Sequence, residues 1–258
     1  MIADGGIART TAQSKNTPGE RPTPSRKPDQ SGRRRLTFTV RPVSFIHPIV
    51  LSPETPVLVD RLTQLTTVGK DGHFAKLERN ARDEYTVTAL VPAGTGDGGA
   101  DPSNLRDAGT AYPPEVVSLY TALSPRIMGP NLTLLRDEVV RTAASSAPYD
   151  LALRTEEILR SSPFQYDTDL RDIDCGSLSI AECFATSHRG FCVQFAVTMA
   201  VLLRDLDVPA RVVMGFMPGS LDAESGIEVI RNSDAHAWVE VYFPGYGWFT
   251  FDPTAGFR

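Results

Sequence analysis

Three residues in the second half of the chain have the types and the spacing of a nucleophilic catalyst. Cys192 directly follows Gly190-Phe191 and begins an apolar run with helical spacing that continues to Leu203. A thiol at a helix N-terminus lies where the peptide dipoles favour negative charge, so its thiolate, the nucleophilic form, is easier to produce. His236 and Asp252 follow at intervals of 44 and 16 residues. The chain therefore offers a nucleophile, a general base and a carboxylate that can orient the base.

His236 and Asp252 fall on two neighbouring predicted strands, so the strand register decides whether their side chains can meet. His236 shares a face with Trp238, and Asp252 shares a face with Trp248. The two faces coincide only if the hairpin pairs residues such as Trp238 with Asp252. That pairing needs a connection of three or five residues around residues 244–247, or a bulge. His236 then lies diagonal to Asp252, within reach of its side chain.

Each of the three residues also has a common structural role. A lone cysteine on a helix is usually part of the core, a lone histidine in a strand is usually a satisfied polar residue, and an aspartate before proline usually forms a turn. Their joint occurrence, in an order that a cysteine triad can use, favours the chemical interpretation over the structural one.

The elements around these residues predict an α+β fold. Prolines and apolar spacing indicate helices over residues 113–123, 132–145 and 149–159, and a fourth from Cys192 that ends before Pro209. Strands are predicted over residues 210–216, 227–230, 235–243 and 248–251. Helices followed by consecutive strands indicate an antiparallel sheet packed on the helix from Cys192.

Composition divides the chain into three predicted parts. Residues 1–35 are rich in proline, serine, glycine and basic residues, which predicts a disordered arm. Residues 36–110 predict a small β-rich region, with strands over 36–40, 57–65, 73–77 and 84–91 and a glycine-rich linker at 94–99. Residues 111–258 contain the predicted helices and sheet of the catalytic core.

The overall composition is that of an ordinary globular protein. Of 258 residues, 41% are apolar and 22% are charged, and the net charge of −5 argues against a nucleic-acid partner, which a basic face would bind. No apolar run reaches the 18 or more residues that a membrane helix needs, so we expect no membrane segment in this chain. No calcium-loop pattern is present, and we expect no cofactor or metal.

The three cysteines leave one alternative open. Cys175 and Cys183 can pair and leave Cys192 free, or remain reduced, and the sequence does not decide between the two states. A structural zinc site formed by these three cysteines and His188 is a weaker alternative, since no Cys-x-x-Cys knuckle occurs.

Four blocks carry a resemblance to a known family. Residues 190–192, 208–215, 234–242 and 247–254 resemble the transglutaminase core family, and the chain is most similar to its bacterial membrane-anchored transglutaminase-like branch. The resemblance implies a papain-like α+β fold with Cys192 as nucleophile, His236 as base and Asp252 as the orienting carboxylate. It also implies acyl transfer on glutamine side chains or peptide bonds through a thioester.

The resemblance leaves location and substrate open. Because relatives of that branch are membrane-anchored, we expect an extracytoplasmic domain if the chain is a fragment, and a cytoplasmic protein otherwise. We expect a protein or peptide substrate, with Trp238, Tyr242 and Trp248 as candidate walls of its groove, although such aromatic residues are more often sheet core. A catalytically silent module that binds peptide or cell wall is the alternative to an enzyme.

Overall fold

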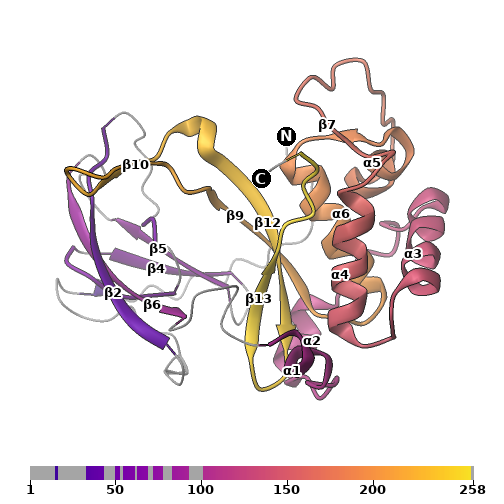
Figure 1. Ribbon diagram of the computed structural model, residues 1–258, viewed down its shortest axis with the longest axis horizontal. Coiled ribbons are helices and arrows are strands. Elements are labelled where there is room, and N and C mark those ends of the chain that lie inside the picture. The colour runs from indigo at the N-terminus through magenta and orange to yellow at the C-terminus, as the bar shows by residue number, and fades with distance from the viewer. Residues whose placement is uncertain are drawn as a thin grey trace. The chain divides into compact units, whose positions relative to one another are not determined.

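The computed structural model of the chain describes residues 15–16, 33–43, 50–52, 55–61, 63–68, 72–77, 83–92 and 101–256. The chain divides into two compact units, Met1–Gly99 and Ala100–Arg258 (Figure 1). Most of the arm predicted over residues 1–35, and the glycine-rich linker predicted at 94–99, lie outside the described residues. Within the arm, the structure describes only residues 15–16 and 33–35, and both segments are in strands.

In the described residues of the first unit, the strands form two small antiparallel sheets. One has the order β2-β6-β3 and the other the order β1-β4-β5. Their strands are β1 (Lys15–Asn16), β2 (Arg33–Val40), β3 (Thr55–Val59), β4 (Thr63–Val68), β5 (Gly72–Leu77) and β6 (Tyr85–Pro92). The expected single strand over residues 57–65 instead forms parts of β3 and β4, which belong to different sheets. Just after β3, the Asp60 side chain accepts a hydrogen bond from the Thr86 amide.

The second unit begins with helices. These are α1 (Pro102–Arg106), α2 (Pro114–Tyr120), α3 (Pro130–Thr142), α4 (Pro148–Leu159), α5 (Ile180–Ser187) and α6 (Cys192–Asp205). The first four start with proline, which suits a position whose N–H would have no partner within the helix. We did not predict α1 or α5, because both are too short for a clear apolar period. None of the helices in the described part of the chain is long and apolar enough to cross a membrane.

A three-stranded antiparallel sheet with the order β13-β12-β9 follows the helices. Its strands are β9 (Ala210–Phe216), β12 (Ala235–Phe243) and β13 (Gly247–Phe251). Short elements complete the unit: the parallel pair β7 (Gln165–Tyr166) and β8 (Arg189–Gly190), the hairpin β10 (Ser220–Asp222) and β11 (Ile227–Val229), and the 3₁₀ turn Asn232–Asp234.

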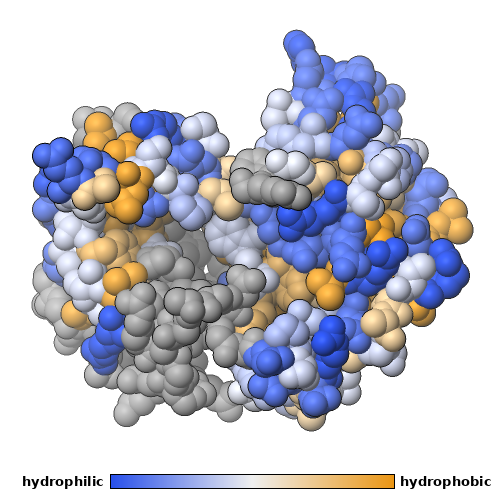
Figure 2. Space-filling model, in the orientation of Figure 1, coloured by the Kyte–Doolittle hydropathy of each residue, from blue (hydrophilic) through white to orange (hydrophobic). Residues whose placement is uncertain are grey.

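The core of the second unit lies between α6 and the sheet. Phe195, Met199 and Leu202 on α6 are fully buried, and so are Val239 and Phe243 on β12. These apolar side chains are inside, whereas the face of this unit seen in Figure 2 is mostly hydrophilic. The predicted α+β fold, with an antiparallel sheet packed on the helix from Cys192, is confirmed.

The β12–β13 hairpin has the register that allows His236 and Asp252 to meet. Val239 pairs with Phe251, and Phe243 pairs with Gly247 across a three-residue connection. Gly247 has a φ of 88°, a conformation that glycine adopts without steric cost, and so closes the short connection. The connection therefore has three residues, one of the lengths that the sequence required for His236 and Asp252 to share a face.

Candidate active site

The start of α6 fixes the position of the thiol. Cys192 is the first residue of the helix, and its side chain is the free thiol among the described cysteines. The Gln194 side chain accepts a hydrogen bond of 3.2 Å from the Phe191 N–H and closes the helix start. A Cβ on Gly190 would lie 2.7 Å from Gln194 Cβ and 2.9 Å from a ring carbon of Phe184, so only glycine fits two residues before Cys192.

The first residues of β12 carry the imidazole. His236 is 3% exposed, and its Nε2 lies 2.8 Å from Asp252 Oδ2, one residue beyond the end of β13. The other carboxylate oxygen of Asp252 accepts a hydrogen bond of 3.1 Å from the Thr254 amide. Asp252 therefore engages one ring nitrogen of His236 and leaves Nδ1 as the nitrogen that can exchange a proton with a neighbour.

That neighbour is Cys192, whose thiol pKa is lowered by the nearby His236 side chain and by the nearby Ala237 backbone N–H. The sheet explains the second contact. N–H groups alternate sides along a strand, and Tyr242 N–H donates to Pro209 on the β9 side, so Ala237 N–H points to the other side. The last β12–β13 pair is Val239 with Phe251. Ala237 therefore lies beyond the end of β13, and its N–H is available to the sulfur.

The three side chains shift one another's pKa values in the direction of an ion pair. Burial raises the pKa of Cys192, but hydrogen bonds from His236 and Ala237 outweigh it and leave the pKa below its ordinary value. Burial lowers the pKa of His236, but Asp252 and then Cys192 raise it to about 9. Burial also raises the pKa of Asp252, and hydrogen bonds from His236 and Thr254 lower it overall. The arrangement favours thiolate, imidazolium and carboxylate together.

The structure places the three predicted groove residues in two different regions. The Trp238 ring lies parallel to His236, with centroids 6.4 Å apart at 23°. Tyr242 and Trp248 lie toward the opposite end of β12, six strand residues or roughly 20 Å from His236. There Trp248 packs against Tyr120 and Tyr242, at 4.7 and 5.3 Å between centroids, and lies 4.1 Å from the Arg211 guanidinium. Only Trp238 is brought together with the three central residues.

A further aromatic residue lies close to the thiol. Tyr166 on β7 pairs with Gly190 on β8, two residues before Cys192. Its pKa is raised, first by burial and then by the negative charge of Cys192, and its side chain is 39% exposed. In the sequence, Phe164 and Tyr166 lie close together, and this was the available signal. The proximity of Tyr166 to Cys192, however, depends on the parallel β7–β8 pair.

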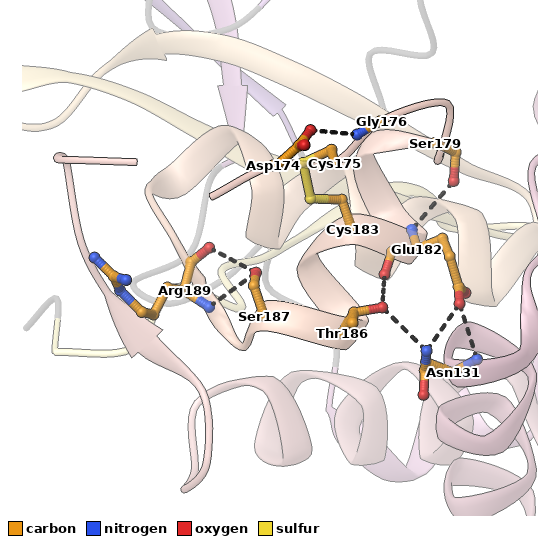
Figure 3. The surroundings of a disulfide bond; sticks show 10 residues. All are labelled: Asn131, Asp174, Cys175, Gly176, Ser179, Glu182, Cys183, Thr186, Ser187 and Arg189. Atoms are coloured by element: carbon orange, nitrogen blue, oxygen red, sulfur yellow. Dashed lines mark hydrogen bonds between the residues drawn. A yellow bond between two sulfur atoms is a disulfide. The ribbon is translucent and has the colours of Figure 1, made fainter. Parts of the chain in front are cut away.

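A disulfide between Cys175 and Cys183 fixes the segment that precedes Cys192 (Figure 3). Cys183 is on α5, beside Glu182, whose buried carboxylate accepts hydrogen bonds from the backbone amides of Asn131 and Leu132 at the start of α3. The disulfide answers the question that the sequence left open.

The disulfide also excludes the zinc alternative as we formulated it, because two of its four candidate ligands are bonded to each other. In the part of the chain that the structure describes, no group of three or more possible metal ligands occurs. Cys192 remains the free thiol of the described cysteines.

Comparison with known families and proteins gives a consistent result. Residues 136–253 match the Transglutaminase-like superfamily. A protein-glutamine gamma-glutamyltransferase of Pseudomonas aeruginosa is 33% identical over 125 residues, which are 48% of this chain and 18% of that protein. The uncharacterized protein YebA of Bacillus subtilis is 37% identical over 114 residues, which are 42% of this chain and 16% of that protein. The chain thus spans less than a fifth of the length of either relative.

Among solved structures, the periplasmic domain of TgpA from Pseudomonas aeruginosa is similar to the chain. The TM-score is 0.61 at 21% identity, and the match covers 97% of this chain and 84% of that one. The same domain bound to ethylmercury gives a TM-score of 0.59 at 22% identity, over 95% of this chain and 76% of that one. At this identity the likeness shows the fold.

Proposed function

We propose that this chain, whose residues 136–253 match the transglutaminase-like superfamily, is a cysteine-dependent acyltransferase acting on glutamine side chains. In this proposal Cys192 is the nucleophile, His236 is the general acid and base, and Asp252 orients the imidazole. The naming of one relative as a protein-glutamine gamma-glutamyltransferase supports this choice of substrate.

One observation carries the proposal: Asp252 contacts one ring nitrogen of His236, and His236 lies close enough to Cys192 for the two to shift each other's pKa. The 2.8 Å contact from Asp252 Oδ2 to His236 Nε2 fixes the ring, and the His236 side chain lowers the pKa of the Cys192 thiol. This is the relation of nucleophile, base and orienting group that activates a thiol. A fold that only bound peptide would need none of these contacts.

The acylation half-reaction follows from this arrangement. The Cys192 thiolate attacks the carboxamide carbon of a glutamine and forms a carbon–sulfur bond, while the carbonyl oxygen takes the negative charge. The Cys192 N–H, one of the first-turn amides without a partner inside the helix, is a donor that can stabilise that charge. His236 imidazolium then gives its proton to the leaving nitrogen. The carbon–nitrogen bond breaks, ammonia leaves, and a thioester remains on Cys192.

The second half-reaction releases the enzyme. A primary amine attacks the thioester carbon, neutral His236 accepts the proton that the amine loses, and the carbon–sulfur bond breaks. The products are a substituted amide, the Cys192 thiolate and the His236 imidazolium, which is the starting state. If water attacks in place of the amine, the product is glutamate, so the same residues also support hydrolysis. Which acceptor is used depends on water exclusion from the thioester.

We also propose that the chain acts outside the cytoplasm. Disulfides persist in oxidising compartments such as the bacterial periplasm, and the Cys175–Cys183 bond fits such a setting. The similar solved domain of TgpA is described as periplasmic, which supports the same location.

The test is incubation with a glutamine-containing protein and a fluorescent primary amine, followed by mass spectrometry, with Cys192→Ala as the matched variant. We expect amine incorporation by the wild-type protein and a loss of at least about 10⁴-fold in the variant, because the nucleophile is gone. Deamidation without incorporation, lost in Cys192→Ala, would make the protein a hydrolase. No product at all, together with slow alkylation of Cys192 by iodoacetamide at neutral pH, would indicate the silent binding module.

A further inference from the structure

The carboxylate that orients His236 is at a position where the sheet no longer holds the backbone. Asp252 follows Phe251, the last residue of β13 that pairs with β12. The Val239–Phe251 pair directs the Phe251 N–H toward β12, since Val239 N–H points to the β13 side. By alternation the Asp252 N–H points away from β12, at the outer edge of the sheet. An edge amide needs a partner from another element or from water.

That partner is on α4. Glu156 Oε1 accepts the hydrogen bond of the Asp252 N–H at 2.8 Å. One turn later, at the C-terminal cap of the same helix, Arg160 Nη1 lies 3.5 Å from the Asp252 carbonyl oxygen. Helix α4 therefore contacts the N–H and the carbonyl of Asp252, while the side chain of Asp252 is engaged by His236 and Thr254.

Helix α4 is a rigid support for this contact. Its buried face carries Leu151, Ala152, Ile158 and Leu159, all within the core that also contains α6. The nucleophile begins α6, so α4 connects the body that holds Cys192 to the strand end that holds Asp252. Glu156 itself is half-buried, and its contact to Asp252 joins residues 96 positions apart in the chain.

We propose that Glu156 is a positioning residue, whose carboxylate oxygen holds the Asp252 backbone so that Asp252 Oδ2 meets His236 Nε2. The inference rests on the proposed function, because it concerns the same three residues. Its action is mechanical: the hydrogen bond requires an acceptor that reaches the Asp252 amide, and the negative charge of Glu156 is not required. Glu156 is one of several acidic residues on an amphipathic helix, and no sequence pattern distinguishes it from the others.

Two substitutions separate reach from charge. Glu156→Gln keeps an oxygen acceptor at the same distance and removes the charge, whereas Glu156→Asp keeps the charge and withdraws the acceptor by one methylene. The matched controls are Glu157→Gln and Glu157→Asp, at an exposed neighbour on the same helix that pairs with Arg154. All four are conservative, and thermal unfolding of each checks that α4 is intact.

Two readouts follow each variant: the kcat and KM of amine incorporation, and the pH dependence of Cys192 alkylation by iodoacetamide. We expect Glu156→Asp to lower kcat by roughly tenfold or more with KM within about twofold, since small misplacements at a reacting centre have effects of this size. The alkylation pKa should rise toward the ordinary thiol value of 9.0, because a less firmly held Asp252 supports the His236 imidazolium less. Glu156→Gln and both Glu157 variants should stay within about twofold of wild type.

The proposal is overturned if Glu156→Asp matches wild type in both readouts, or if Glu156→Gln is as impaired as Glu156→Asp, which would assign the effect to charge. Equal impairment by the Glu157 variants would also overturn it. The alkylation readout needs no substrate. A wild-type protein that incorporates no amine would therefore contradict the proposed function, while the shift in alkylation pKa would still test Glu156.

Discussion

The two ends of β12 follow the same alternation of side chains but have different neighbours. From Val239 to Phe243 the strand pairs with β13 on one side, and as far as Val241 it pairs with β9 on the other. From Ala235 to Trp238 it pairs with β9 alone. We call residues 239–243, where β12 pairs with β13, the closed end; there, aromatic rings and the apolar core fill the space around the strand. We call residues 235–238, where β12 pairs with β9 alone, the open end; there, the side without a neighbouring strand faces Cys192.

This difference in strand pairing explains why the candidate site lies at one end of β12. A strand with two neighbours uses its N–H groups in the hydrogen-bond ladder of the sheet, whereas the Ala237 N–H lies beyond the end of β13 and lowers the pKa of Cys192. His236 and Tyr242 occupy equivalent positions in the alternation, yet His236 meets a thiol and a carboxylate, whereas Tyr242 meets Tyr112 and Trp248. The proposed chemistry therefore depends on the termination of β13 at Phe251 as much as on the residue types.

The largest test of this contrast replaces the imidazole at the open end. His236→Gln removes the proton acceptor and the cation beside the thiol, so we expect amine incorporation to fall by at least about 10³-fold. The alkylation pKa of Cys192 should rise toward 9.0, because the leading hydrogen bond that lowers it is lost. The control is Tyr242→Phe, which should leave both quantities unchanged. An unchanged alkylation profile in His236→Gln would show that the thiol is not activated by His236.

His236 and Cys192 together should set the pH profile of amine incorporation by the wild-type protein. The imidazolium must be present to protonate the leaving ammonia, so incorporation should fall as pH rises through about 9, the raised pKa of His236. It should also fall as pH decreases through the lowered pKa of Cys192, since the thiolate is then lost. Initial rates between pH 5 and 10 measure both limbs. An alkaline limb near the ordinary histidine value of 6.5 would contradict the contact with Asp252.

The second test breaks the closed end. Phe243 is fully buried and packs against the rings of Tyr149 and Phe249, at 6.2 and 5.7 Å between centroids. Phe243→Ala should lower the free energy of unfolding by about 3–5 kcal/mol, because a large core cavity is left. Urea unfolding measures it, and Leu134→Ala, at a residue 67% exposed, should change it by only about 0.5 kcal/mol.

The alkylation rate of Cys192 in folded Phe243→Ala protein should equal that of wild type, since the open end does not depend on this ring. A slower rate in the folded variant would mean that the two ends of β12 are coupled. The two ends of β12 would then differ in their contacts, but both would contribute to the reactivity of Cys192.

Much of this arrangement was predictable because it depends on local periods. Alternation along residues 235–243 placed His236 and Trp238 on one face, and it required a hairpin register that the three-residue connection before Gly247 provides. The apolar run from Cys192 predicted α6 and its amphipathic contact with the sheet. These inferences use spacings of two and about four residues, which a single sequence displays directly.

The remaining features depend on contacts between distant segments, which no period encodes. The Glu156 contact to Asp252, the proximity of Tyr166 to Cys192 and the Ala237 amide all require the placement of α4, β7 and the end of β13. The pairing of Cys175 with Cys183 had the same status, because α5 brings Cys183 into reach and its eight residues show too little periodicity to predict. Trp248 was predicted to line the same substrate groove as Trp238 because both are large aromatic residues. In the structure Trp238 lies beside His236, whereas Trp248 pairs with Tyr242 at the other end of β12.

The smallest test asks which tryptophan contacts substrate. The Trp238 ring lies beside His236 and packs over Gly215. A Cβ at position 215 would lie 2.7 Å from this ring, so the glycine makes room for Trp238 next to the proposed catalytic residues. Trp238→Ala should raise KM about threefold to tenfold, equivalent to roughly 1 kcal/mol of lost binding. Trp248→Ala should leave KM within about twofold and instead lower stability, since its ring covers Arg211 and Tyr120. The reverse pattern, in which only Trp248→Ala raises KM, would move the substrate groove to the closed end of β12 and leave Trp238 as part of the support for His236.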